Sequence, residues 1–167
     1  MRSVEIDLPD EGATAALARR IGTVLRPGDT LLLSGPVGAG KSHFARALIQ
    51  DRLARVGAPV EDVPSPSFTL VQTYEAGAVA LWHADLYRLA APDELLELGL
   101  FEALADAITL IEWPERLGPE RPDRHLAIAL DLAGPVRPDA RRVRITAAGP
   151  GWERVIGAAM RAEGAAA

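Results

Sequence analysis

The stretch Ser34-Gly35-Pro36-Val37-Gly38-Ala39-Gly40-Lys41-Ser42 decides how the rest of this chain is interpreted. It fits the pattern G-x-x-x-x-G-K-[ST], with a short apolar run at 30–33 that predicts a buried strand and residues from 41 to about 56 that predict a helix. Glycines between a strand and a helix let successive backbone N–H groups point into one hollow, to which the helix N-terminus adds partial positive charge. The stretch therefore predicts a phosphate-binding loop.

The residue types in this loop predict how a nucleotide would be held. Lys41 is expected to reach the β- and γ-phosphates, and the Ser42 hydroxyl to bind Mg²⁺. Of 18 Lys and Arg residues only Lys41 is a lysine, at the place where a flexible ammonium suits a phosphate better than a planar guanidinium. The expected nucleotide-binding set in the loop is Val37, Gly38, Ala39, Gly40, Lys41, Ser42 and His43.

Length and composition limit the class of protein. With 167 residues, 49% of them hydrophobic and 25% charged, the chain is expected to form one globular domain over 1–167, with a disordered tail from about 163. It contains no run of about 18 apolar residues and has an acidic N-terminus, so we expect no membrane association and a cytoplasmic location. The absence of Cys excludes disulfides and thiolate metal sites. The net charge of −5 argues against direct binding of nucleic acid, so any such role would run through a partner.

Periodicity and turn residues predict the other elements. A strand at 4–8 and a helix at about 13–25 precede the loop, and Gly57 is expected to cap the helix that follows it. The later elements are strands at 68–74, 79–84 and 107–111, helical turns at 91–98 and 101–105, a loop at 117–123, a hairpin of strands 125–132 and 142–146 around a mobile turn at 134–139, and a helix at 152–162.

Three hydroxyl residues follow the loop helix: Ser65, Ser67 and Thr69. Prolines hold the first half of their segment extended. By residue type alone these hydroxyls are most often turn and strand-edge groups. Their position after the loop helix instead favours a switch segment that senses the γ-phosphate or Mg²⁺.

Two carboxylates at predicted strand ends compete for the metal. Asp85 follows the strand at 79–84, and Glu112 follows the more apolar run 108–111. Either could be a strand-end cap. An enzyme with a phosphate loop uses an acid at the end of a buried strand to hold Mg²⁺. Because the run 108–111 is expected to be the more central strand, we predict Glu112 as the metal partner and Asp85 as the second acid.

The aromatic and imidazole side chains near these acids have simpler interpretations. Trp113 could stack on a base or close the pocket, although a core tryptophan is the more frequent case. His83 and His125 lie within predicted strands and are interpreted as structural. Three dispersed His and no Cys argue against a zinc site.

Several motifs follow one another in a fixed order along the chain. They are Pro9-Asp10-Glu11, Gly38-Ala39-Gly40-Lys41-Ser42, Ser65-Pro66-Ser67-Phe68-Thr69-Leu70-Val71, His83-Ala84-Asp85-Leu86-Tyr87-Arg88-Leu89 and Ile111-Glu112-Trp113-Pro114. Together they closely resemble the TsaE (YjeE) family over roughly 4–146. Many families share the glycine-rich loop, whereas the ordered set S-P-[ST]-[FY]-T-L-V, D-L-Y-R and E-W-P is highly specific.

The resemblance implies an α/β, P-loop NTPase-like three-layer fold, in which a mixed, mostly parallel sheet with an antiparallel edge carries helices on both faces. It implies an ATPase with ATP and Mg²⁺ as cofactors that is needed for N6-threonylcarbamoyladenosine (t6A) in tRNA. Such a protein acts on a complex of TsaB and TsaD rather than performing the transfer, meets tRNA only indirectly, and is by itself a monomer or weakly self-associating.

The resemblance also implies roles for single residues. Lys41 would hold phosphates, Ser42 and Glu112 would serve Mg²⁺, and Asp85 and Trp113 would be needed for activity. Ser42 replaces a commoner threonine of the family, and His43 replaces a commoner second hydroxyl.

Further implied contacts are less closely defined. Thr69 would belong to the switch-like loop, and Glu11 would lie near the nucleotide. The turn in the late hairpin departs from the family in length, so the arginine of this hairpin that would contact the nucleotide could be Arg137, Arg141 or Arg142. Of these three we predict Arg142.

Two rival functions stay open. A small-molecule kinase would need an acceptor pocket and an arginine-bearing lid, for which Arg116, Arg121 and Arg124 are candidates, although the chain leaves little room for a lid. A nucleotide-gated adaptor with negligible turnover differs little from the ATPase at the level of sequence. A GTPase is disfavoured because the guanine-reading N/T-K-x-D motif requires a second lysine.

Overall fold

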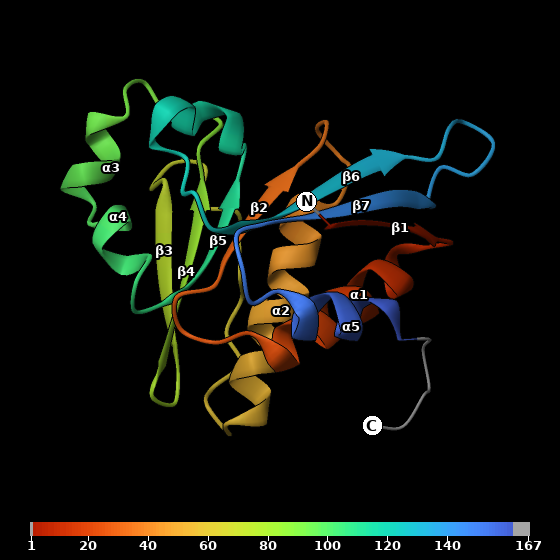
Figure 1. The fold of residues 1–167 in the computed structure, drawn as a ribbon, viewed down its shortest axis with the longest axis horizontal. Helices are drawn as coiled ribbons and strands as arrows, with labels where there is room; N and C mark the ends of the chain where they lie inside the picture. The colour runs from red at the N-terminus through yellow and green to blue at the C-terminus, as the bar shows by residue number, and fades with distance from the viewer. Residues whose placement is uncertain (1, 162–167) are drawn as a thin grey trace.

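A computed structural model describes residues 2–161 of the chain (Figure 1). Within these residues, the strands form one seven-stranded sheet in the order β1-β7-β6-β2-β5-β4-β3. The strands are β1 (Arg2–Leu8), β2 (Thr30–Ser34), β3 (Val71–Ala76), β4 (Val79–Asp85), β5 (Ile108–Glu112), β6 (His125–Leu132) and β7 (Arg141–Ala148).

The sheet is parallel at its centre and antiparallel at both edges. Strands β6, β2, β5 and β4 run parallel to one another. The late hairpin β6–β7 and then β1 form one antiparallel edge, as expected, and the hairpin β3–β4 forms a second. The predicted mixed α/β sheet is confirmed, with one more antiparallel edge than the resemblance implied.

Helices cover both faces of this sheet. They are α1 (Glu11–Val24), α2 (Lys41–Arg55), α3 (Asp93–Glu97), α4 (Leu100–Ala103), the 3₁₀ helix η1 (Pro114–Glu120) and α5 (Glu153–Met160). One buried cluster joins the sheet to α1, α2 and α5, and a second joins the opposite face to α3, α4 and η1 (Figure 1). Among residues 2–161, none of the helices has the length and apolar character that crossing a membrane would require.

Strand β2 is buried on both faces, which explains its unbroken apolar sequence. Leu31 and Leu33 pack into the cluster with α1 and α2, and Leu32 packs into the opposite cluster. Each such leucine contributes about 2 kcal/mol through burial. The end of β2 is therefore rigidly placed, and with it the start of the glycine-rich loop.

The main differences from the sequence prediction concern the segments 68–71, 117–123 and 152–160. The strand predicted from residue 68 begins at Val71, because Leu70 has a positive φ of 65° that interrupts the extended chain and leaves Phe68 in a turn. Part of the predicted loop at 117–123 is the 3₁₀ helix η1. The C-terminal helix ends at Met160. The predicted disordered tail lies outside the described residues, and the single-domain organisation stays a prediction.

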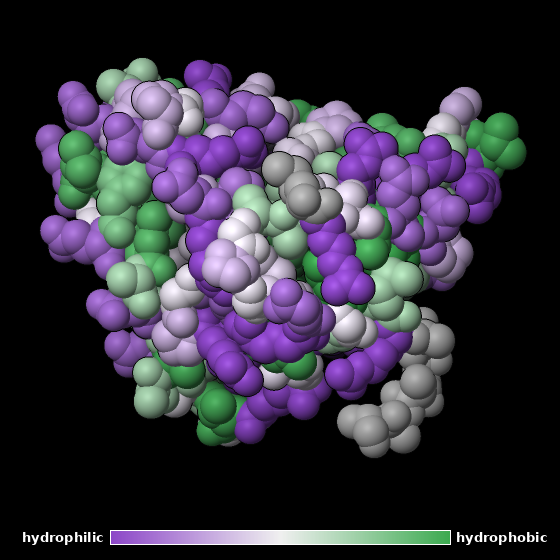
Figure 2. All heavy atoms as spheres, in the orientation of Figure 1, coloured by the Kyte–Doolittle hydropathy of each residue, from purple (hydrophilic) through white to green (hydrophobic). Residues whose placement is uncertain are grey.

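The surface is mostly polar in the view of Figure 2, with hydrophobic side chains in several small groups, one of them on the side of α3 and α4. Leu96 and Leu98 contribute to the exposed apolar area of this region. Gly57, as predicted, caps α2 in the left-handed conformation with a φ of 68°.

Candidate functional site

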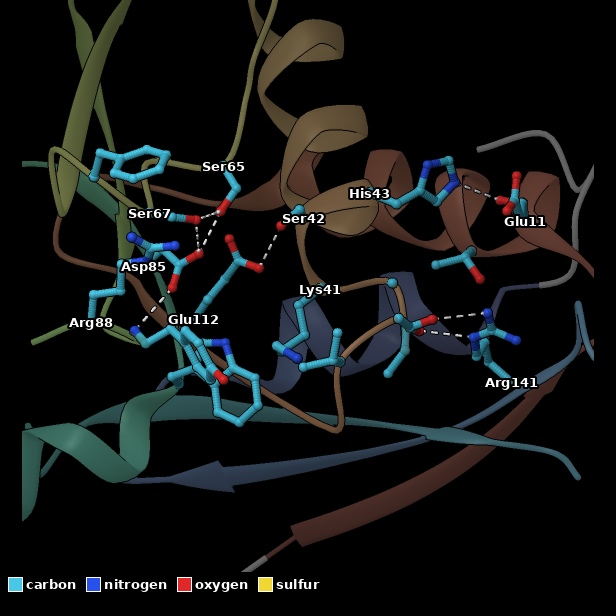
Figure 3. A pocket seen from close by; sticks show the side chains of 18 of the residues that line it. Glu11, Lys41, Ser42, His43, Ser65, Ser67, Asp85, Arg88, Glu112 and Arg141 are labelled. Atoms are coloured by element: carbon cyan, nitrogen blue, oxygen red, sulfur yellow. Dashed lines mark hydrogen bonds between the residues drawn. The ribbon is translucent and has the colours of Figure 1, made fainter.

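The glycine-rich loop joins the end of β2 to the first residue of α2, Lys41 (Figure 3). Gly35 cannot be replaced without movement, because a Cβ there would lie 2.2 Å from the carbonyl oxygen of Leu130 on β6. Gly40 precedes the helix with a φ of 104°, a conformation that side-chain-bearing residues rarely adopt. The loop backbone is thus held against the sheet at one end and turned toward the helix N-terminus at the other.

A cavity of about 630 Å³ opens beside this loop, at the carboxyl ends of the parallel strands. In open α/β sheets, this edge is the usual place for a ligand. The cavity brings together most of the predicted site residues: Glu11, Val37, Gly38, Ala39, Gly40, Lys41, Ser42, His43, Asp85, Glu112 and Trp113.

Lys41 is held inside the loop. Its Nζ donates hydrogen bonds to the carbonyl oxygens of Gly35 at 2.6 Å and Pro36 at 3.0 Å, and lies 4.2 Å from the ring centroid of Trp113. Burial lowers the pKa of Lys41 below its ordinary value, while nearby carboxylates, Glu112 first among them, act in the opposite direction. An anion bound in the loop would stabilise the protonated, positively charged form of this buried amine.

Glu112, at the end of β5, is 1% exposed and has both carboxylate oxygens in contact with donors. Ser42 Oγ donates to Oε1 at 2.8 Å, and His83 Nε2 lies 2.7 Å from Oε2. In the described part of the chain no cluster of three or more His, Cys, Asp or Glu could hold a metal by itself. Mg²⁺ takes few protein ligands and completes its shell with water and phosphate oxygens, so this hydroxyl–carboxylate pair fits it.

Asp85, at the end of β4, holds the serine-containing segment. Its Oδ2 accepts hydrogen bonds from Ser65 Oγ and, at 3.2 Å, from Ser67 Oγ. Its Oδ1 accepts the N–H of Tyr87 at 3.0 Å, and its own N–H donates to the carbonyl of Leu70 at 2.9 Å. Both serines line the cavity, so Asp85 ties that wall to the sheet.

Trp113 forms part of the cavity wall and also packs against the core cluster beneath α3, α4 and η1. It is half-buried, has a positive φ of 56°, and its ring centroid lies 5.0 Å from that of Tyr87. Its ring lies over the ammonium group of Lys41. This position suits the predicted pocket-closing role, while the packing of the ring also agrees with the core interpretation.

Two of the predicted site residues, Thr69 and Arg142, do not line the cavity. Thr69 is exposed and does not line the cavity, because the turn before Val71 directs the chain away from it. Arg142 is 59% exposed and pairs with Asp7 of β1 at 3.3 Å. Side chains alternate along a strand, so the neighbouring Arg141 points the other way.

Arg141 is the late arginine that reaches the loop. Its Nε donates to the carbonyl oxygen of Ala39 at 2.9 Å, and one of its terminal nitrogens donates to that of Gly38 at 3.2 Å (Figure 3). These bonds fix the middle of the glycine-rich loop from the side of β7. Residue type and spacing left three arginines open. Arg137 lies in the turn before β7, and the alternation of side chains along β7 distinguishes Arg141 from Arg142.

His43 and His83 have contacts that sequence reasoning did not supply. His43 Nε2 donates to the carbonyl of Glu11 at 2.9 Å, which places the starts of α1 and α2 together at the cavity. His83, interpreted from sequence as structural, contacts the carboxylate of Glu112. The signal was available in the spacing, since His83 and Asp85 are two residues apart on one strand and so share a face.

The fold and site together define an α/β protein with a glycine-rich loop, a lysine, a hydroxyl and two acids at the carboxyl ends of its parallel strands. The family model described as threonylcarbamoyl adenosine biosynthesis protein TsaE matches residues 8–141. The chain belongs to the TsaE family, as its ordered motifs predicted.

Curated relatives agree with this assignment. The tRNA threonylcarbamoyladenosine biosynthesis protein TsaE of Bacillus subtilis is 33% identical over 147 residues, covering 87% of this chain and 85% of that one. The protein of the same name from Streptomyces coelicolor is 34% identical over 140 residues, covering 81% and 91%. That from Rickettsia felis is 41% identical over 108 residues, covering 65% of this chain and 61% of the relative, so this chain spans less than two thirds of the Rickettsia protein.

A solved structure supports the fold. The crystal structure of Bacillus subtilis YdiB superposes with a TM-score of 0.74 at 26% sequence identity, covering 95% of this chain and 94% of that one.

Proposed function

We propose that this chain binds ATP with Mg²⁺ and hydrolyses it, and that this cycle acts on a complex of TsaB and TsaD homologues during t6A formation in tRNA. The names of the relatives, which all concern t6A biosynthesis, support the process. The observation that carries the chemical part is the hydrogen bond of 2.8 Å between Ser42 Oγ and Glu112 Oε1, directly behind Lys41 at the loop.

The residues of the cavity suit phosphate chemistry. Lys41 would neutralise phosphate charge, and Ser42 and Glu112 would hold Mg²⁺. When bound, Mg²⁺ would stabilise negative charge that develops on the transferred phosphoryl group. Asp85 would keep the wall with Ser65 and Ser67 in place, and Trp113 would exclude water from Lys41.

The partners in this proposal are those that the family resemblance implies, and the charge of the protein supports an indirect contact with tRNA. A net charge of −5 makes the protein a poor direct ligand for tRNA, so contact with tRNA would run through the partner complex. A cytoplasmic location and a monomeric or weakly self-associating state stay predictions that accompany this function.

The kinase alternative loses one of its lid candidates. Arg124 donates to Asp29 Oδ1 at 2.9 Å and to the carbonyl of Gly28 at 3.1 Å, before the start of β2 and so at the end of the sheet opposite the cavity. Arg116, by contrast, is close to the cavity through its bond of 3.2 Å to the carbonyl of Tyr87.

The test is ATP hydrolysis by the pure protein, alone and with the TsaB–TsaD pair of the same organism, with Lys41→Ala as the control. We expect weak turnover alone, a clear change on adding the pair, and loss of both in Lys41→Ala. Turnover that is indifferent to the pair, or that requires a small acceptor, would favour a kinase. ATP binding without turnover under either condition would favour a nucleotide-gated adaptor.

A further inference from the structure

His83 lies at the level where the hydrophobic core meets the cavity. It is two residues before Asp85 on β4, and Asp85 is directly opposite Glu112 of β5 in the parallel register. Two residues earlier on the same face, Leu81 is fully buried in the core with α2. Along this face of β4 the side chains therefore change from apolar (Leu81) to polar (His83 and Asp85) toward the cavity. His83 contacts Glu112 from the side of the core.

The contact between the two side chains is short and dry. His83 Nε2 lies 2.7 Å from Glu112 Oε2, and the exposed fractions of the two side chains are 0% and 2%. Since a carboxylate can only accept, Nε2 carries the hydrogen and donates it. Glu112 thus receives one hydrogen bond from below, on Oε2, and one from Ser42, on Oε1.

A purely structural residue would not be expected here. The other ring nitrogen of His83, Nδ1, is buried and has no hydrogen-bond partner in the described part of the chain. Leaving a buried polar atom unpaired is unfavourable, and a leucine such as Leu81 would fill the space without it. The imidazole is therefore explained better by the one bond that it makes than by its packing.

We propose that His83 is a positioning residue for the cation site. By holding Oε2, it fixes the rotation of the Glu112 carboxylate so that Oε1 faces Ser42 and the cavity. This inference rests on the proposed use of Mg²⁺ with a nucleotide, and it adds to that site a residue that the sequence alone indicated to be structural. Groups that orient a ligand to a metal typically change metal affinity by about 10- to 100-fold when they are removed.

The experiment measures ADP binding to the full chain by titration calorimetry over a series of Mg²⁺ concentrations and in EDTA. His83→Leu removes the donor at similar volume. We expect its half-saturating Mg²⁺ concentration to rise about tenfold or more, with ADP binding in EDTA unchanged. His83→Gln, whose amide N–H can occupy the place of Nε2–H, should restore most of the Mg²⁺ dependence.

His125→Leu is the matched control. Like His83 on β4, His125 lies on a strand, at the start of β6. Its Nδ1 bonds to the carbonyl of Pro122 at 2.7 Å, outside the cavity. This variant should keep the wild-type Mg²⁺ dependence. If it shifts by as much as His83→Leu does, the effect is general to the fold and the proposal fails.

The remaining outcomes are also decisive. Wild-type Mg²⁺ dependence in His83→Leu, or no recovery in His83→Gln, would overturn the positioning role while leaving the proposed function intact. No Mg²⁺ dependence in the wild type would overturn both. If thermal unfolding shows that His83→Leu does not fold, the comparison becomes His83→Gln with His83→Asn, whose shorter amide cannot reach Oε2. Equal Mg²⁺ dependence in those two variants would overturn the proposal.

Discussion

Two carboxylates are buried at opposite ends of the central strands, and their partners differ in kind. Asp29, before β2, is 2% exposed, and Glu112, at the end of β5, is 1% exposed. Asp29 accepts from Arg124 at 2.9 Å, from Arg154, and from the backbone N–H of Arg26 at 2.8 Å. Glu112 accepts only from a hydroxyl and an imidazole among the described residues.

The difference suits a structural role for Asp29 and the proposed Mg²⁺-binding role for Glu112. Two guanidinium groups neutralise Asp29, so this carboxylate would not attract a further cation. Glu112 is held by a hydroxyl and an imidazole at the wall of a cavity and interacts electrostatically with Lys41, and the proposed Mg²⁺ would add positive charge there. Two equally buried carboxylates thus differ in their donors, and this difference supports the proposed role of Glu112.

The largest expected effect is on stability, at Asp29. Asp29→Ala leaves Arg124 and Arg154 without their carboxylate. It should lower the free energy of unfolding by about 3 kcal/mol. This value is near the low end of the range for breaking a buried ion pair, because both arginines are partly exposed. Urea denaturation checks this. ADP affinity of the folded fraction should stay at the wild-type value, and a large loss would contradict the separation of the two ends.

The next effect is on turnover, at Glu112. Glu112→Gln keeps the shape but removes the charge, so Mg²⁺-dependent hydrolysis should fall on the order of 100-fold. ADP binding in EDTA should be little changed, which steady-state kinetics and calorimetry together would establish. Normal hydrolysis in this variant would show that the metal assignment is wrong.

A smaller effect concerns the wall that Asp85 holds. Ser65→Ala with Ser67→Ala removes both hydroxyl donors to Oδ2 and should destabilise that segment by about 1 kcal/mol per bond. Faster amide hydrogen exchange at 65–70, with unchanged exchange in the core of α2, is the expected measurement. Unchanged exchange at 65–70 would mean that backbone contacts alone hold the segment.

The smallest effect is a pH dependence through Lys41. Burial lowers the pKa of Lys41 in the free protein, and bound phosphate favours the protonated form. ADP binding must therefore take up a proton once the pH exceeds that lowered pKa, so affinity should be constant below it and should fall as the pH rises through it. Lys41→Arg, which stays charged, should show a flatter profile in calorimetry; parallel profiles would assign the pH dependence to another group.

Much of the fold was predictable because its signals are local. The glycine-rich loop, the apolar runs of β2 and β5 and the cap at Gly57 each depend on a few consecutive residues. The errors fell where local signals conflict with longer contacts. Phe68 looks like part of a strand, but the turn at Leu70 places it outside the sheet with 83% of its surface exposed.

The site divides in the same way. Residue type and short spacing were enough to predict the loop with Lys41 and Ser42, the strand-end acids, and membership of the TsaE family. The folded chain was needed to show that Arg141 rather than Arg142 reaches the loop and that His83 bonds to Glu112. Those contacts join segments that are distant in sequence, so they depend on strand order and register, which no local pattern encodes.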